Sequence, residues 1–181
     1  MCGIAGFSFK ENVSQKENIL KIMNDKLSHR GPDGEGFYQD DDVSFSHKRL
    51  AIIDLNSRSD QPFIDKNNQY VVVFNGEIYN YIELRKLLID AGYKFLTTSD
   101  TEVLLKSYIN WGVDLLQKIK GMFAFAIYDK KKKQIFCSRD HFGQKPFFYY
   151  WKDGNFIFSS ELTSLISNPV IKKEISIKSI M

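Results

Sequence analysis

The 181-residue sequence is poor in the residues that mark several classes of protein. It contains only two cysteines, Cys2 and Cys137, and three scattered histidines, too few for a disulfide framework or a zinc site. The formal net charge of +3 is too small to indicate a nucleic-acid partner. These scarcities exclude a disulfide-rich scaffold and a zinc domain, and we expect neither a metal nor a nucleic acid to take part in the function.

Long apolar runs are also missing. No window holds the roughly eighteen uninterrupted apolar residues that a membrane-spanning helix needs. No charged stretch followed by an apolar run, as in a secretory signal, opens the chain. We therefore expect a cytoplasmic protein with reduced thiols and no membrane partner. The one basic run, residues 130–133, lies between apolar stretches and indicates a solvated hairpin turn.

Apolar and aromatic residues, in contrast, are plentiful. A hydrophobic content of 43% with 15 Phe is typical of a globular domain with a ring-rich core, and the length suits one domain over residues 1–181. Apolar side chains at helical spacing predict a helix over residues 15–27, and the Gly- and Pro-rich stretch 28–36 predicts a shaped loop. Strands are expected over residues 3–9, 37–39, 43–55 and 69–79.

Two further helices are expected in the middle of the chain. Residues 81–92 form an amphipathic pattern in which Leu87 lies on the apolar face. Residues 99–112 open with Ser99 and Glu102 at capping-box spacing, which is typical of a helix start.

Four short apolar strands separated by tight polar loops follow Gly121 and favour antiparallel pairing. The stretches 122–129 and 71–74 are apolar on both strand faces. Antiparallel sheets usually leave one face in water, so these strands need cover on both faces. Two sheets packed on each other, with helices over their outer faces, would supply that cover. We therefore predict an α+β fold, a four-layer αββα sandwich of two mainly antiparallel sheets.

Cys2 directly follows the initiator methionine. Removal of Met1 would leave one residue with both a thiol and a free α-amine, and an α-amine has an ordinary pKa near ~7.7–8.0, so it accepts a proton close to neutral pH. N-terminal threonine hydrolases use such a pair as nucleophile and base. Taken alone, Cys2 also fits a small buried apolar residue.

Other segments carry side chains that suit the chemistry of an amide. Asn75 and Gly76 offer two adjacent donors for an oxyanion, or else an ordinary Asn-Gly turn. Arg49, inside an apolar strand, offers a planar fork for a carboxylate, or else an ion pair within the protein. Asp100 suits an ammonium group, or else the start of its helix. Together with Cys2, these groups suit an amino acid with a terminal amide, such as glutamine.

Blocks of sequence that run in order along nearly the whole chain include “MCGIAGF”, “HRGPDGEG”, “HKRLAIIDL”, “VVFNGEIYNYIELR”, “SDTEVLL”, “GMFAFAIYD” and “RDHFGQKPFFY”. In these blocks the sequence closely resembles the glutamine-hydrolysing domain of asparagine synthetases, which are class II glutamine amidotransferases of the N-terminal nucleophile hydrolase superfamily. “CGI” alone would also match other amidotransferases, whereas “NGEIYNYIELR” and “GMFAFAIYD” resemble the asparagine synthetase branch. The αββα sandwich is also the fold that the resemblance implies.

The resemblance implies a role for each candidate residue. Cys2, freed by removal of Met1, would be the nucleophile, with its own α-amine as the general base. Asn75 and Gly76 would form the oxyanion hole. The glutamine-binding set would comprise Asn75 and Gly76 again, Arg49 at the α-carboxylate, Glu77 and Asp100 at the α-amino group, and the backbone of Leu50, Ala51, Ile52 and Ile53.

The implied reaction passes through a thioester: the thiolate attacks the side-chain amide of L-glutamine, ammonia leaves, and water releases glutamate. In asparagine synthetases, a second domain uses the ammonia, with ATP and Mg²⁺, to amidate aspartate. The “SGGxD”-type loop of that domain does not occur in this sequence. We therefore expect the synthetase domain and its cofactors outside this chain, as a covalent or separate partner. A homodimer is one assembly that the resemblance allows.

Two alternatives stay open. The same glutaminase could serve another acceptor, such as a sugar of a surface polysaccharide, because the missing domain chooses the acceptor. The fold could also bind glutamine or another partner without turnover. A retained Met1 would favour this second alternative, because an amide nitrogen at Cys2 cannot act as a base.

Overall fold

The chain forms two antiparallel sheets and the helices that cover them. The structure, a computed structural model, describes residues 1–11 and 13–173. One sheet has the strand order β2 (Gly34–Gln39), β3 (Ser44–Arg49), β1 (Gly3–Ser8), β9 (Asn155–Ser159) and β8 (Phe148–Lys152). The other has the order β4 (Phe63–Ile64), β5 (Tyr70–Ile78), β6 (Gly121–Asp129) and β7 (Gln134–Arg139). The helices are α1 (Lys16–Asp25), α2 (Tyr81–Asp90), α3 (Asp100–Trp111) and α4 (Leu162–Leu165), with short 3-10 helices at Ser57–Ser59 and Gly112–Gln117.

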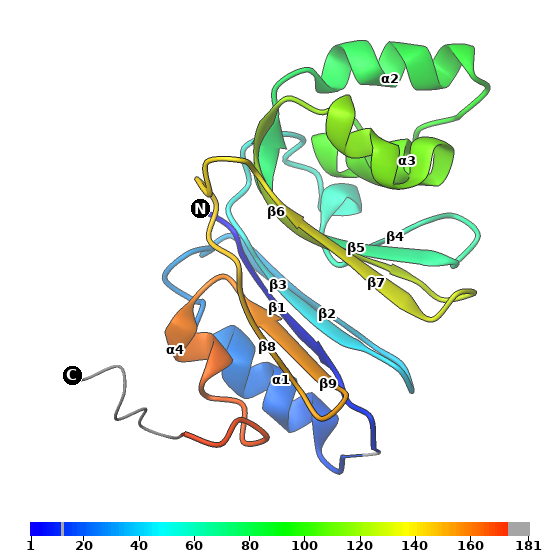
Figure 1. Ribbon diagram of the computed structural model, residues 1–181. Helices are drawn as coiled ribbons and strands as arrows, with labels where there is room; N and C mark the ends of the chain where they lie inside the picture. The colour runs from blue at the N-terminus through cyan, green and yellow to red at the C-terminus, as the bar shows by residue number, and fades with distance from the viewer. Residues whose placement is uncertain (12, 174–181) are drawn as a thin grey trace.

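The sheets and helices stack in four layers. Figure 1 shows the two sheets face to face, with α2 and α3 outside the four-stranded sheet and α1 and α4 outside the five-stranded sheet. Strand pairings in both sheets are antiparallel, including β1 with β3 and β9, and β6 with β5 and β7. The predicted αββα sandwich is therefore confirmed, although the last part of the expected 1–181 domain, residues 174–181, lies outside the described residues.

Strand β6 shows why the fold needs cover on both sides. Phe125 and Ile127 belong to the apolar cluster under α2 and α3. Ala124 and Ala126 belong to the cluster between the two sheets. Neighbouring side chains of a strand point to opposite faces. A strand that is apolar on both faces is therefore shielded from water only when it lies between two apolar layers.

Helix α3 begins where the capping pattern predicts. The Ser99 hydroxyl accepts a hydrogen bond from the backbone N–H of Glu102 at 3.3 Å. The second half of the capping box differs from the expectation, because the Glu102 carboxylate accepts from the backbone N–H groups of Leu96 and Thr97. The buried glutamate therefore ties the preceding loop to the first turn of the helix, close to the position of Asp100.

Two expectations about element limits and burial are wrong. The strand predicted over residues 43–55 ends at Arg49, because β2 begins opposite Arg49 and β1 begins opposite Lys48, so no neighbouring strand continues the ladder. Leu87, predicted on the apolar face of its helix, is 54% exposed, whereas Leu84 and Leu88 are buried. The outer helix buries a narrower stripe than the sequence pattern indicates.

The basic run forms the β6–β7 turn, as predicted. The Asp129 carboxylate accepts the backbone N–H groups of Lys131 and Lys132, which closes the turn while the lysine side chains stay exposed. Among the residues that the structure describes, no helix has both the length and the apolar character required to span a bilayer.

The packing between the sheets makes a testable prediction at Phe158. This ring is fully buried and lies 5.4 Å from the Phe45 ring and 5.3 Å from the Phe147 ring, between centroids. We expect Phe158→Ala to lower the free energy of unfolding by about 3–5 kcal/mol, because it leaves a cavity. Urea unfolding measures the change, and the control is Phe142→Ala, since Phe142 is 91% exposed. Equal effects of the two substitutions would contradict the described packing.

Candidate active site

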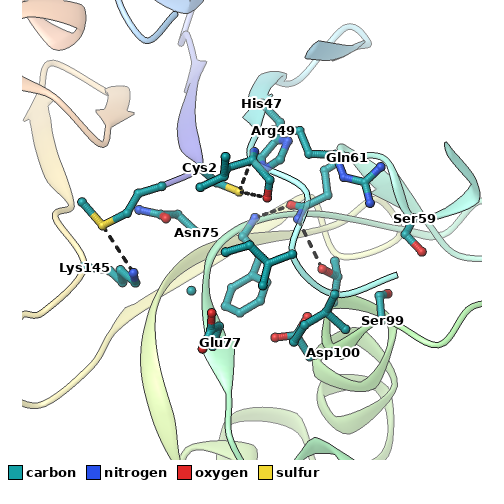
Figure 2. A pocket seen from close by; sticks show the side chains of 17 residues that line it. Cys2, His47, Arg49, Ser59, Gln61, Asn75, Glu77, Ser99, Asp100 and Lys145 are labelled. Atoms are coloured by element: carbon teal, nitrogen blue, oxygen red, sulfur yellow. Dashed lines mark hydrogen bonds between the residues drawn. The ribbon is translucent and has the colours of Figure 1, made fainter. Parts of the chain in front are cut away.

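Cys2 and Asn75 line the same pocket, Cys2 beside the five-stranded sheet and Asn75 from the four-stranded sheet. Cys2 shares a strand face with Ile4, and Asn75 shares a strand face with Val73, because alternate residues of a strand point the same way. Ile4 and Val73 both lie in the apolar cluster between the sheets. Cys2 and Asn75 therefore lie at the end of this shared layer, where they line one pocket. Figure 2 shows this pocket and its labelled side chains.

The Cys2 thiol is held against the loop that follows β3. Its Sγ accepts a hydrogen bond from the Leu50 backbone N–H at 3.4 Å and lies 3.6 Å from the Leu50 carbonyl oxygen, to which it donates. Burial raises the pKa of the thiol, while the Leu50 N–H and the positive charges of the chain terminus and Arg49 act in the opposite direction. A thiolate at this position therefore depends on nearby donors and positive charge.

Asn75 and Gly76 lie inside a strand, which excludes the hairpin-turn alternative. They pair with Ala124 and Phe123 of β6. Asn75 is 1% exposed, and its side-chain Nδ2 has no hydrogen-bond partner in the described structure. An unpaired buried donor costs free energy, so this amide is a donor held ready for an acceptor that enters the pocket.

Gly76 is required by close packing. A Cβ atom built at this position would lie 2.3 Å from the Met122 carbonyl oxygen and 2.8 Å from the Phe123 Cα atom. The absence of a side chain therefore lets β5 lie close against β6 while its backbone borders the pocket.

Arg49 borders the pocket and also forms the ion pair that the sequence left open. Its guanidinium donates to the Asp60 carboxylate and to the backbone carbonyl groups of Asp54 and Asn56. These contacts fix the guanidinium at the mouth of the pocket. They use only part of its five N–H donors, which leaves further donor capacity for an anion.

Asp100 and Glu77 place two carboxylates in the same pocket. Asp100 is the first residue of α3, and its Oδ2 accepts a hydrogen bond from the Ile78 backbone N–H at 3.1 Å. Burial raises the pKa of Asp100 to about 6, and the charge of Glu77 adds to this effect. Two neighbouring carboxylates favour a cationic ligand group beside them, and Asp100 therefore takes part in both the helix start and the pocket.

The loop after β3 contributes most, but not all, of the residues expected from it. Leu50, Ile52 and Ile53 line the pocket, whereas Ala51 does not. The Ala51 backbone N–H instead donates to the Asp33 carboxylate at 2.8 Å. This bond anchors the loop to the Gly- and Pro-rich segment that precedes β2.

Several lining residues were not identified as site residues from the sequence. The Gln61 side chain accepts the Phe74 backbone N–H at 2.6 Å and donates to the Thr101 hydroxyl at 3.2 Å. Burial lowers the pKa of His47 to about 3, so its ring is neutral at pH 7. Lys145 also lines the pocket. His47 and Lys145 lie within the blocks “HKRLAIIDL” and “RDHFGQKPFFY”, and that is the one sequence signal that could have marked them, because their position depends on the tertiary packing.

The chain start is fastened beside the thiol. The Met1 amino group donates to the Arg30 carbonyl oxygen at 3.0 Å, and Arg30 Nε donates to the Cys2 carbonyl oxygen at 2.9 Å. The Arg30 guanidinium also pairs with Glu161. Within residues 1–11 and 13–173, no group of three or more His, Cys, Asp or Glu side chains is arranged to hold a metal ion.

Comparison with solved structures shows that the fold is shared with a protein of known structure. The chain is similar to the glutamine phosphoribosylpyrophosphate amidotransferase of B. subtilis, solved with ADP and GMP, with a TM-score of 0.75 and 22% sequence identity. The similarity covers 92% of this chain and 43% of that chain. At this identity, it shows a shared fold.

Comparison of sequences then identifies the family. A profile of the glutamine amidotransferase domain matches residues 1–181. The glutamine-hydrolysing asparagine synthetases 3 and 1 of Bacillus subtilis (strain 168) are 42% and 43% identical to the chain. These matches cover 97% and 92% of this chain. The chain belongs to the glutamine amidotransferase domain family, and it spans 29% and 27% of the lengths of those two relatives.

The packing at Gly76 predicts the cost of adding one methyl group. We expect Gly76→Ala to lower the free energy of unfolding by about 1–3 kcal/mol, because the new Cβ overlaps the β6 backbone. Gly34→Ala is the matched control, since its Cβ would meet no atom closer than 3.8 Å, and we expect a change within about 0.5 kcal/mol. Urea unfolding of both variants measures the difference, and a neutral Gly76→Ala would contradict the close approach of β5 and β6.

Proposed function

We propose that this domain hydrolyses L-glutamine to glutamate and ammonia after removal of Met1. The observation that carries the proposal is the meeting of the Cys2 thiol with the unpaired, buried Asn75 amide in one pocket. A nucleophile opposite a preorganised donor is the arrangement that attack on a carboxamide requires. Membership of the glutamine amidotransferase domain family supports the same reaction.

The first step needs a free amine at Cys2. In the unprocessed chain the Cys2 nitrogen belongs to a peptide bond and carries no proton-accepting lone pair. Once Met1 is removed, the α-amine takes the proton of the Cys2 thiol, and the sulfur attacks the Cδ atom of glutamine. The new S–C bond places negative charge on the former carbonyl oxygen, where Asn75 Nδ2 and the Gly76 backbone N–H would donate.

The second half of the reaction releases the two products. The tetrahedral species collapses, the C–N bond breaks, and the proton held by the α-amine passes to the leaving nitrogen, so that ammonia departs. Water then attacks the γ-glutamyl thioester with the same amine as base, which yields glutamate and restores the thiol.

The charged side chains that line the pocket suit the two charged groups on the α-carbon of glutamine. Arg49 would receive the α-carboxylate with the donors that its contacts to the loop and Asp60 leave available. Asp100 and Glu77 would receive the α-ammonium group. The backbone of Leu50, Ile52 and Ile53 would enclose the substrate. Ala51 does not line the pocket, and its role would be to anchor the loop through its hydrogen bond to Asp33.

The use of the ammonia is a further part of the proposal. The relatives at 42–43% identity are named as asparagine synthetases and extend well beyond the matched region. We infer that ammonia from this domain serves the ATP- and Mg²⁺-dependent amidation of aspartate by a synthetase domain, in the cytoplasm. A sugar acceptor would require a different synthetase domain, and the names of these relatives favour aspartate.

Substitution of the thiol tests the proposed chemistry. We expect Cys2→Ala to reduce ammonia release from glutamine by on the order of 10⁴-fold or more, because the covalent route is lost. Cys137→Ala is the matched control, since Cys137 lies on β7 outside this pocket, and it should retain full activity. Intact-mass measurement must show that Met1 is absent from the active protein. Full activity in Cys2→Ala, or in protein that retains Met1, would overturn the proposal.

The raised pKa of Asp100 predicts how binding depends on pH. Below pH 6 the Asp100 carboxyl becomes neutral while the glutamine ammonium stays charged, so the attraction is lost as the pH falls. In the Cys2→Ala protein, calorimetry should show the Kd for glutamine rising about tenfold per pH unit below about pH 6. Asp100→Asn should bind more weakly at pH 7 and lose this dependence. The same pH dependence in Asp100→Asn would assign it to another group.

A further inference from the structure

Lys145 is a buried cation at the chain start, and the proposed reaction does not yet use it. It is 7% exposed and lies in the loop that joins β7 to β8. Its ammonium donates to the Met1 Sδ atom at 3.4 Å, as Figure 2 shows. Among the residues that the structure describes, it forms no ion pair with a carboxylate. In Figure 1 this yellow loop passes beside the N-terminus.

The loop that carries Lys145 is held in place by an unusual number of bonds. The Asp140 carboxylate accepts backbone N–H groups from Phe123 of β6 and, within the loop, from Phe142, Gln144 and Lys145. The Arg139 side chain donates to the Lys145 carbonyl oxygen at 2.7 Å and also to the Gly143 carbonyl oxygen. The backbone of Lys145 therefore has little freedom, and its side chain extends from a fixed point toward the site.

A thioether is a poor partner for a buried ammonium. Methionine sulfur is a weak acceptor, and a buried cation without an anionic partner is costly. Because the Met1 side chain spans the space between Lys145 Nζ and the Cys2 nitrogen, removal of Met1 takes away this partner. The ammonium and the new α-amine are then separated by no more than the 3.4 Å contact plus the length of Met1 itself.

We propose that Lys145 is a positioning residue whose fixed positive charge keeps the Cys2 α-amine neutral and able to accept the thiol proton. This inference rests on the proposed function. The ammonium disfavours a second positive charge nearby, so the amine releases its proton at a lower pH. The proton transfer itself is unchanged: the Cys2 thiol gives its proton to the amine on the same residue, and the same charge stabilises the thiolate that remains.

The other cations around the amine are offset by carboxylates or engaged by backbone carbonyl groups. Arg30, which donates to the Cys2 carbonyl oxygen, and Arg49, which lowers the pKa of the thiol, are each paired with a carboxylate, Glu161 and Asp60 respectively. The unpaired carboxylates of the pocket, those of Glu77 and Asp100, favour a protonated amine. On the loop itself, the Asp140 carboxylate is occupied by backbone N–H groups and Arg139 by backbone carbonyl groups. Of the two lysine and arginine side chains that line the pocket, Arg49 is paired with Asp60, whereas Lys145 has no ion pair among the described residues and can oppose the two pocket carboxylates.

The test compares the pH dependence of glutamine hydrolysis in Met-processed variants. The acidic limb of kcat/KM reports the pKa of the free enzyme's base. Lys145→Met removes the charge at similar length and should move this limb to higher pH by about one unit, the effect of a unit charge several ångströms away in a partly buried site. Lys145→Arg keeps the positive charge and should show the acidic limb at the same pH as the wild-type protein. Lys131→Met, in the exposed β6–β7 turn, is the charge-matched control and should leave the limb unchanged.

A second readout does not depend on glutamine. Alkylation of Cys2 by iodoacetamide, followed by peptide mass, titrates the thiolate directly, and Lys145→Met should shift this titration to higher pH as well. If the wild-type protein shows no glutamine hydrolysis, the proposed function fails, yet the alkylation profiles still decide the role of Lys145. An unshifted limb and an unshifted alkylation profile in folded Lys145→Met would overturn the inference. Should this variant not fold, Lys145→Gln takes its place in both measurements.

Discussion

The separation of the two sheets is the constraint on which the pocket depends. Within the part of the chain that the structure describes, no strand pairing joins the five-stranded sheet to the four-stranded sheet, so their spacing is set by side chains such as Phe45, Phe158 and Tyr128. Face-to-face sheets pack about 10 Å apart, a distance that side chains from both faces must fill. Cys2 extends from one sheet and Asn75 from the other at the end of this layer. The alignment of the proposed nucleophile with the proposed oxyanion donor therefore rests on core packing.

The pocket also shows how polar groups at the ends of strands are stabilised. Arg49 ends its strand and is fixed by carbonyl groups of the following loop. Asp54, in that loop, accepts the Thr98 backbone N–H and hydroxyl, just before α3. Gln61 joins β5 to Thr101 of α3. A side chain from each segment thus holds the backbone of another, and the groups around the pocket are positioned without a bound ligand.

Much of this architecture could be predicted from the sequence. Strands that are apolar on both faces require a middle layer, and the Ser99–Glu102 spacing marked the start of α3 because capping is a local effect. The end of β3 at Arg49 could not be predicted, since it depends on where two other strands begin. The exposure of Leu87 likewise depends on what lies outside its helix, which the periodicity does not encode.

The candidate site residues also divide into those that the sequence could predict and those that it could not. Cys2, Asn75 and Asp100 could be selected only as a set, because each alone also fits an ordinary structural role and together they suit a terminal amide. Ala51 was selected as part of a run, and one hydrogen bond to Asp33 directs its backbone elsewhere. Lys145 had no local signal: a lysine in a loop is normally solvated, and only the crossing from β7 to β8 brings it to the chain start.

The proposed contacts to the carboxylate, ammonium and carboxamide groups of glutamine come from separate segments of the chain. This arrangement has a stereochemical consequence. Arg49 follows from the five-stranded sheet, Asp100 from a helix outside the other sheet, and the Cys2–Asn75 pair from the layer between them. Receptors for an anion, a cation and a carboxamide that do not lie on one line bind a tetrahedral carbon through three of its substituents. In the proposed binding mode, only one hand of an α-amino acid would satisfy all three at once, so the mirror-image substrate would forfeit one contact.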